Sequence, residues 1–366
     1  MERLLVVSCV SDDVFSPISM YLMKNHFEDV KEGVKEYAKD AFSEVIYLLP
    51  EGESAEGVNV RNCKCSPVLS NPYAVAQVLI GNLPRPMIQD DFVAEYEGKE
   101  ITVITPEEAV ATKNGKDDKF VAVTRDGKTE IKKAKVGSSI CELVDVSGAK
   151  AVLIGGFKGC FETPGKAAEL KIEDSEKFSS IKVYGKDECI VDACKELTAL
   201  ANDCSCGKCV LCREGTSQFR QIVAEMTTGK ARISDVDMIK DVSSLISIGA
   251  YCPFGQHMTG PLTSAMELFA DEFEEHIKKK ECRCGKCYKA EATYVIMPDL
   301  CTGCGDCIDE CPEDAIEGKD GFIHMIDQDL CERCGKCVKA CDEDAIVTVT
   351  GKLPKLPKKL TKVGKW

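Results

Sequence analysis

Residues 301–311 read Cys301-Thr-Gly-Cys304-Gly-Asp-Cys307-Ile-Asp-Glu-Cys311, and residues 331–341 read Cys331-Glu-Arg-Cys334-Gly-Lys-Cys337-Val-Lys-Ala-Cys341. Both copies have the spacing C-x2-C-x2-C-x3-C, in which three thiolates of one copy and the fourth of the other converge on one cubane. Zinc sites pair two C-x2-C knuckles and would leave the other cysteines of each copy unused. We therefore expect two [4Fe-4S] clusters, one on Cys301, Cys304, Cys307 and Cys341 and one on Cys331, Cys334, Cys337 and Cys311.

The composition agrees with metal binding rather than with a disulfide scaffold. Of 23 cysteines in 366 residues, sixteen lie between Cys204 and Cys341. Disulfide scaffolds belong to small secreted chains, whereas the first ten residues here resemble a buried strand and not a secretory signal. We therefore expect a reducing cytoplasmic setting. With 47 basic and 61 acidic side chains, the formal charge of −14 argues against nucleic-acid binding. The sequence contains no apolar run of 18 residues, so it does not predict a membrane span.

A further cysteine group lies upstream, in Cys206-Gly-Lys-Cys209-Val-Leu-Cys212-Arg-Glu-Gly-Thr and in Cys252-Pro-Phe-Gly. With these flanking residues the group resembles the NADH-binding flavoprotein subunit of respiratory complex I and of electron-bifurcating [FeFe] hydrogenases. The resemblance includes Asp187-Glu-Cys-Ile-Val-Asp-Ala-Cys, Glu275-His-Ile-Lys and the appended two-[4Fe-4S] ferredoxin domain of the bifurcating branch. It implies a third [4Fe-4S] cluster, held in a helical bundle by Cys206, Cys209, Cys212 and Cys252.

The expected fold class is α+β with several domains. Strand-like runs at 4–10, 45–49 and 101–104, with an amphipathic helical pattern between the first two, predict an α/β region over residues 1–118. An Asp-Gly hairpin signal and the resemblance predict a β-grasp, SLBB-like domain over 119–186. Helical patterns, including one over 263–280, predict the bundle over 187–280. A zinc linker and ferredoxin domain over 281–351 and a basic tail over 352–366 complete the chain.

One departure from the family concerns the flavin. The family binds FMN and NADH with a glycine-rich loop near its start and a following Asn-Ala-Asp-Glu-Gly-Glu-Pro-Gly stretch. At the place of the second, this chain has Ser8-Cys-Val-Ser-Asp-Asp-Val-Phe, without glycines that let backbone amides approach a phosphate. The sequence's Gly-Gly pair, Gly155-Gly156, falls in the β-grasp region instead. We expect residues 1–118 to be a degenerate flavin-domain remnant, with neither FMN nor NAD bound.

Three more cysteines lie ahead of the ferredoxin repeat, in Cys282-Arg-Cys284-Gly-Lys-Cys287. Similarity to the bifurcating branch favours one zinc ion in a Cys3His or Cys2His site, held by Cys282 and Cys287, with or without Cys284, and by His324; His276 is the weaker alternative for the histidine. A trio without metal and a further iron–sulfur cluster are the other interpretations. Cys189 and Cys194 are interpreted as small buried hydrophobic residues, and Cys63, Cys65 and Cys204 remain without an assignment.

The sequence contains neither a nucleophile–base pair nor a phosphate-binding loop, so it does not predict catalysis by this chain. The expected role is an iron–sulfur subunit of a multi-subunit anaerobic oxidoreductase, which relays low-potential electrons between ferredoxin or a flavin subunit and a catalytic subunit. Expected partners are flavoprotein, [2Fe-2S] and catalytic subunits of a hydrogenase, formate dehydrogenase or aldehyde oxidoreductase. The alternatives are an NADH-oxidising FMN diaphorase and a redox-sensing regulatory module.

Overall fold

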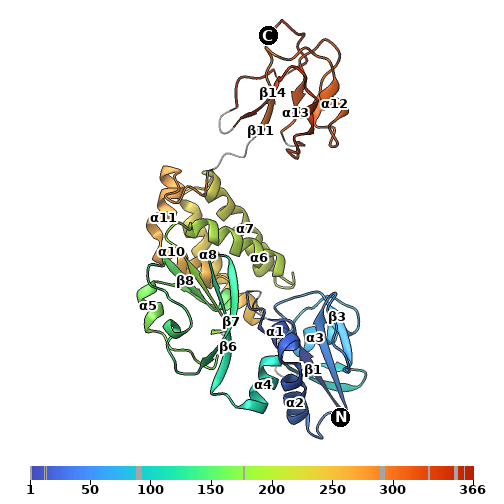
Figure 1. The fold of residues 1–366 in the computed structure, drawn as a ribbon, viewed down its shortest axis with the longest axis vertical. Coiled ribbons are helices and arrows are strands. Elements are labelled where there is room, and N and C mark those ends of the chain that lie inside the picture. The colour runs from blue at the N-terminus through green and yellow to red at the C-terminus, as the bar shows by residue number, and fades with distance from the viewer. Residues whose placement is uncertain are drawn as a thin grey trace. The chain divides into compact units, whose positions relative to one another are not determined.

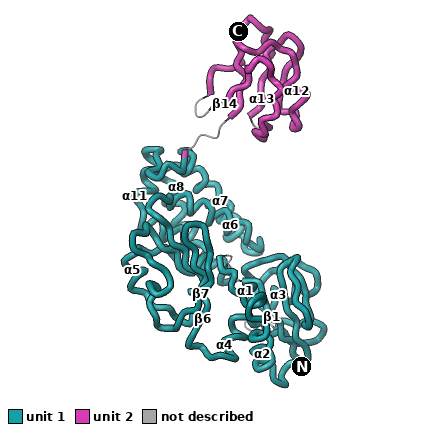
Figure 2. Tube along the Cα trace, in the orientation of Figure 1, with its two compact units in different colours: residues 1–287 teal, residues 288–366 magenta. Residues whose placement is uncertain are grey.

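The computed structural model describes residues 2–11, 13, 15–87, 93–175, 178–288, 293–328, 330–349, 353–357 and 359–366. These residues form a mixed α and β structure with two compact units, residues 1–287 and 288–366 (Figure 2). Among the residues that are described, no helix has both the length and the apolar character needed to cross a membrane.

The first unit begins with a five-stranded sheet of order β3-β2-β1-β5-β4 (Figure 1). Strands β1, β2, β3 and β5 are parallel, and β4 runs antiparallel to β5. Because β1 is the middle strand, Leu4, Leu5, Val6 and Val7 are fully buried on both faces of the sheet. The strands are β1 (Glu2–Ser8), β2 (Glu44–Pro50), β3 (Val60–Cys63), β4 (Glu95–Tyr96) and β5 (Lys99–Ile104).

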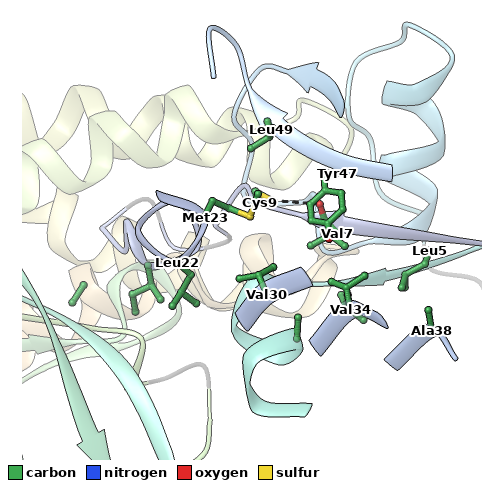
Figure 3. Close-up of a cluster of buried hydrophobic side chains, with 14 residues drawn as sticks. Leu5, Val7, Cys9, Leu22, Met23, Val30, Val34, Ala38, Tyr47 and Leu49 are labelled. Atoms are coloured by element: carbon green, nitrogen blue, oxygen red, sulfur yellow. Dashed lines mark hydrogen bonds between the residues drawn. The ribbon is translucent and has the colours of Figure 1, made fainter. Parts of the chain in front are cut away.

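Helices cover both faces of this sheet. Helices α1 (Ile18–Asn25), α2 (Phe27–Ala38) and α4 (Pro106–Asn114) pack against one face, and Figure 3 shows their buried side chains around Val7 and Cys9. Helix α3 (Pro72–Leu79) packs against the other face. The crossing of α2 and α4 is so close that a Cβ atom on Gly33 would lie 1.9 Å from the backbone oxygen of Ala109. A glycine is therefore required at that crossing.

A second sheet of order β7-β6-β10-β8-β9 follows. Its first hairpin turns at Asp126 and Gly127, whose φ angles of 51° and 73° suit a two-residue turn and the Asp-Gly signal. The strands are β6 (Asp118–Arg125), β7 (Lys128–Lys135), β8 (Ala151–Ile154), β9 (Cys160–Glu162) and β10 (Ser180–Tyr184), with short helices η1 (Ile140–Glu142), η2 (Gly156–Lys158) and α5 (Pro164–Glu169). Ala122 of β6 belongs to the same buried cluster as α1, α2 and α4.

The rest of the first unit is helical. It consists of α6 (Ile190–Cys204), α7 (Val210–Thr228), α8 (Ser234–Gly249), α9 (Pro253–His257), α10 (Gly260–Leu268), α11 (Ala270–Glu274) and the π-helical turn η4 (Glu275–Lys279). The helical pattern over 263–280 is thus interrupted at Phe269 and widens into a π turn. This turn carries His276, which is 0% exposed.

The second unit contains two similar halves. Strand β11 (Thr293–Ile296) pairs with β14 (Ile346–Val349), and β12 (Ile316–Glu317) pairs with β13 (Met325–Ile326), both antiparallel. Helices α12 (Asp306–Asp309) and α13 (Lys336–Ala340) follow the two cysteine loops. The predicted basic tail returns to this unit, because residues 361–363 pair with residues 321–323: the Ile323 amide donates to the Thr361 carbonyl at 2.9 Å. Lys352 and Lys358 lie outside the described residues.

Candidate iron–sulfur and metal centres

The second unit brings the eight cysteines of the repeat into the two expected groups. Cys301, Cys304, Cys307 and Cys341 line one pocket, together with His324. Cys311, Cys331, Cys334 and Cys337 line another, together with Tyr294. Each pocket thus takes three cysteines from one loop and the fourth from the other half of the repeat, which is the donor set of a cubane cluster.

The thiols of each group act on one another electrostatically. Burial raises the pKa of Cys307 to about 12, with further increases from Cys301, Cys304 and Cys341. Burial likewise raises the pKa of Cys337, and Cys331, Cys311 and Cys334 add to it. The four sulfurs of each group would therefore need a cation between them to be held together as thiolates.

His324 lies beside the first of these groups. Its side chain is 1% exposed, and Nδ1 lies 3.6 Å from the Cys301 sulfur. Burial lowers the pKa of His324, which favours the neutral imidazole. The residue expected to bind zinc with Cys282, Cys284 and Cys287 is therefore placed at a cysteine of the ferredoxin repeat instead.

The helical part of the first unit holds the third thiol group. Cys206 and Cys209 lie in the loop before α7, Cys212 is buried in the first turn of α7, and Cys252 caps α9. A Cβ atom added to Gly255 would lie 3.8 Å from the sulfurs of both Cys212 and Cys252.

Backbone amides point at the sulfurs of this third group. The Tyr251 amide donates to the Cys209 sulfur at 3.4 Å and the Gly255 amide donates to the Cys252 sulfur at 3.5 Å. Burial raises the pKa of Cys212 to about 11, with contributions from the other three thiols. The four expected ligands are thus assembled, with donors that suit thiolates bound to a metal.

A fourth metal-binding group joins segments that are far apart in the sequence. The ligand atoms of Cys189, His276, Cys282 and Cys287 all lie within 4.8 Å of one another. The Cys189 sulfur is 3.4 Å from His276 Nε2 and 3.6 Å from the Cys287 sulfur. In tetrahedral zinc, bonds of about 2.3 Å to sulfur and about 2.0 Å to nitrogen separate two sulfurs by about 3.8 Å and sulfur from nitrogen by about 3.5 Å. The group therefore fits one zinc ion, and its sulfurs are too far apart for a disulfide of about 2.05 Å.

The surroundings of this group prepare it for a cation. His276 Nδ1 lies 2.8 Å from the backbone oxygen of Glu272, an arrangement that places the proton on Nδ1 and turns Nε2 toward the sulfurs. Burial alone would raise the pKa of Cys282, but the backbone amides of Cys287, Lys286 and Cys284 outweigh it and lower this pKa to about 6. A thiolate is thus available at neutral pH.

Cys284 points away from the group. Its sulfur lies 3.3 Å from the Glu188 carbonyl and 3.5 Å from Lys150 Nζ. Lys150 also forms an ion pair of 2.7 Å with Glu272, whose side chain is 1% exposed and accepts a hydrogen bond from the Ile190 amide at 3.0 Å. Of the expected zinc ligands, the structure brings together Cys282 and Cys287, and it supplies Cys189 and the alternative histidine His276 in place of Cys284 and His324.

The Gly155-Gly156 turn holds a carboxylate of this chain. A Cβ atom on Gly156 would lie 2.2 Å from Oδ1 of Asp13, so the side chain fills the space beside the turn. Asp13 is 6% exposed and accepts hydrogen bonds from the hydroxyls of Ser179 and Ser180 and from the Phe15 amide. Asp12 and Val14, which belong to the stretch without glycines, lie outside the described residues.

Comparison with known proteins matches both parts of the chain. Residues 192–276 match the NADH-ubiquinone oxidoreductase-F iron-sulfur binding region, and residues 300–346 match a 4Fe-4S dicluster domain. The HndC component of the NADP-reducing hydrogenase of Solidesulfovibrio fructosivorans is 34% identical over 203 residues, which are 50% of this chain and 40% of the relative. The NADH-quinone oxidoreductase F protein of Streptomyces coelicolor is 27% identical over 166 residues, 41% of this chain and 36% of the relative.

A solved structure has the same fold over most of the chain. The NAD+-reducing [NiFe]-hydrogenase in its H2-reduced state matches with a TM-score of 0.67 at 17% identity, covering 76% of this chain and 57% of that chain. The matched residues span about two fifths of the length of the curated relatives. These matches confirm the resemblance inferred from the cysteine motifs. The chain therefore contains an iron–sulfur binding region of the NADH-ubiquinone oxidoreductase F type, followed by a 4Fe-4S dicluster domain.

Proposed function

We propose that this chain is an iron–sulfur electron-transfer subunit of a multi-subunit oxidoreductase in the cytoplasm of an anaerobe. The observation that carries the proposal is the assembly of three separate groups of four cysteines, on Cys206, Cys301 and Cys331 and their partners. Three [4Fe-4S] clusters supply one-electron chemistry, and the chain's own residues hold them, exclude water and set their electrostatic surroundings. Low-potential electrons pass between ferredoxin or a flavin subunit and a catalytic partner.

Electrons enter and leave this chain through other proteins and not through a bound flavin. This part of the proposal is supported by Asp13, because its buried side chain fills the space beside the Gly155-Gly156 turn that a phosphate would need in order to approach the backbone amides. The partners are the flavoprotein, [2Fe-2S] and catalytic subunits of a hydrogenase, formate dehydrogenase or aldehyde oxidoreductase.

The response of the protein to reduced ferredoxin and to NADH distinguishes an electron-transfer subunit from a diaphorase. Protein purified without oxygen should lose its iron–sulfur absorbance when reduced ferredoxin is added and should remain oxidised with NADH alone. Acid extraction should release no stoichiometric flavin. Bleaching by NADH together with one FMN per chain would overturn the proposal in favour of the diaphorase.

A matched pair of variants tests the number of clusters through the iron content. Three cubanes amount to about twelve iron and twelve sulfide per chain. Cys206→Ala should reduce the iron content to about eight, because it removes a ligand of the bundle cluster. Cys204→Ala, two residues away and outside the group, should retain about twelve. Equal iron in both variants would exclude a cluster on Cys206.

The proposed zinc ion is held by Cys189, His276, Cys282 and Cys287. Structural zinc contributes directly to folding, and here it would fix the knuckle of residues 282–287 to helix α6 and the π turn. Cys287→Ser should lower zinc from about one per chain to near zero with iron unchanged. Cys284→Ser, in the same knuckle, should keep its zinc. Zinc loss in Cys284→Ser but not in Cys287→Ser would contradict this ligand set.

A further inference from the structure

The two halves of the second unit differ at one equivalent position. Tyr294 precedes Cys301 by seven residues, and His324 precedes Cys331 by seven residues, so the internal repeat aligns the two side chains. Each lies at the cysteine group that begins in the other half: Tyr294 lines the pocket of Cys331, and His324 lines the pocket of Cys301. The repeat therefore gives each cluster site one aromatic neighbour, a phenol at one and an imidazole at the other.

The imidazole is placed to donate a hydrogen bond to a cluster ligand. His324 Nδ1 lies 3.6 Å from the Cys301 sulfur, and the side chain is 1% exposed. A thiolate bound to iron has no proton to give, so the contact is favourable when Nδ1 carries the proton. A neutral imidazole then leaves Nε2 as an acceptor, and this atom has no hydrogen-bond partner among the described residues.

The backbone around His324 fixes this orientation. A Cβ atom on Gly318 would lie 1.8 Å from Cδ2 and 2.6 Å from Nε2 of the ring, so residue 318 closes the side opposite the sulfur. The preceding residue, Ile323, is tied to the C-terminal tail by its hydrogen bond to Thr361. The ring thus has little freedom to leave Cys301.

Tyr294 makes no such contact. Its hydroxyl lies beside Gly335, where an added Cβ atom would be 2.9 Å away, and within the described part of the chain its hydroxyl forms no hydrogen bond to a cysteine sulfur. At this second group the Ala315 backbone amide donates to the Cys311 sulfur at 3.3 Å. The two sites therefore share a ligand pattern, and the side-chain N–H donor lies at the Cys301 group.

We propose that His324 is a positioning residue that donates its Nδ1–H to the Cys301 sulfur and thereby raises the reduction potential of that cluster. The inference rests on the proposed clusters. A hydrogen bond to a ligating sulfur withdraws negative charge from it and favours the reduced cluster.

Two substitutions at residue 324 test the donor in the full-length protein. His324→Phe keeps a ring and removes the N–H, and His324→Asn places an amide N–H close to the position of Nδ1. A redox titration followed by electron paramagnetic resonance should show a lower potential for one cluster in His324→Phe. The expected change is about tenfold in the ratio of reduced to oxidised cluster at a fixed potential, which is about 59 mV for one electron.

The controls separate the donor from packing and from metal binding. Tyr294→Phe should leave both potentials unchanged, and His324→Asn should restore most of the lost potential. In deuterated buffer, an exchangeable proton coupled to the reduced cluster should be seen in the wild-type protein and be missing in His324→Phe. Zinc content should be the same in all variants.

The outcomes distinguish a failure of the inference about His324 from a failure of the proposed clusters. An unchanged potential in His324→Phe with about twelve iron overturns the inference while leaving the proposed clusters in place. Wild-type protein with fewer than twelve iron would instead count against the proposed function. If His324→Phe loses iron, Gly318→Ala decides, because its methyl group displaces the ring without removing it: a lowered potential supports the inference, and an unchanged one overturns it.

Discussion

The buried ion pair beside the zinc group gives a quantitative prediction. Glu272 is 1% exposed, and its carboxylate pairs with Lys150 Nζ at 2.7 Å and accepts from the Ile190 amide at 3.0 Å. Glu272→Ala removes both interactions and leaves the ammonium with the Glu188 carbonyl and the Cys284 sulfur. Losing one partner of a buried pair costs about 3–5 kcal/mol. Because the Lys150 side chain is 13% exposed, water relieves part of this penalty. We therefore expect Glu272→Ala to lower the free energy of unfolding by about 3 kcal/mol.

Thermal unfolding of anaerobic, zinc-loaded protein measures the effect. A loss of about 3 kcal/mol should lower the midpoint by about 5 °C for a unit of 287 residues, compared at one scan rate. Glu272→Gln keeps an acceptor for the Ile190 amide and should fall between the wild type and Glu272→Ala. The double variant Lys150→Met, Glu272→Leu removes both charges and should recover most of the stability.

The neighbouring residue supplies the control. Asp271 forms an ion pair of 2.8 Å with Arg283, but both side chains are exposed, at 70% and 41%. Asp271→Ala should therefore cost less than about 1 kcal/mol. The reasoning is refuted if Glu272→Ala and Asp271→Ala lower the midpoint equally, or if the double variant is no more stable than Glu272→Ala.

Three other predictions concern single sites. Burial raises the pKa of Glu107 from 4.5 to about 7. Its stabilising contribution is therefore complete below pH 4.5 and is lost as the pH rises through 7. In thermal unfolding, Glu107→Gln should be more stable than the wild type by up to about 3 kcal/mol at pH 8 and equally stable at pH 4.5. Gly33→Ala should destabilise by at least about 1–3 kcal/mol because α4 blocks the methyl group, whereas Gly165→Ala meets no atom within 4 Å and should be neutral. After zinc is removed by a chelator, iodoacetamide at pH 7 should label Cys282, whose pKa is about 6, faster than Cys284, whose pKa burial raises; mass spectrometry that finds equal rates would contradict this.

The sequence predicts which cysteines come together in the three groups because most of the members of each group are local. Three of the four cysteines in each group lie within seven residues, as in Cys301–Cys307 and Cys206–Cys212, and the internal repeat supplies the fourth for the ferredoxin pair. A spacing of this kind requires a tight loop, so the geometry is contained in the motif itself.

The group of Cys189, His276, Cys282 and Cys287 could be predicted only in part, for the opposite reason. Cys189 and His276 are separated by 87 residues and meet where the N-terminus of α6 lies beside the π turn. No spacing in the sequence records this contact, and a cysteine ahead of an apolar helix also fits a small core residue. The knuckle supplied Cys282 and Cys287, whereas its middle cysteine, Cys284, is drawn away by Lys150.

The break in the helical pattern over 263–280 has a similar origin. The residues have helical spacing throughout, yet the chain turns at Phe269 and widens at η4 so that His276 points inward. Helix propensity depends on neighbouring residues in the sequence, so it cannot predict the contact of His276 with the distant Cys189.

Asp13 has a consequence for the order in which the protein is made. The carboxylate after β1 is buried against Ser180 of β10, a partner 167 residues later in the chain. At about 5–20 residues per second, the ribosome needs roughly 8–33 s to deliver that partner after Asp13 has emerged. During this time the loop after the first strand has no burial site for its charge. The loop that carries Asp13 can therefore reach its final, buried arrangement only after the second sheet has been synthesised.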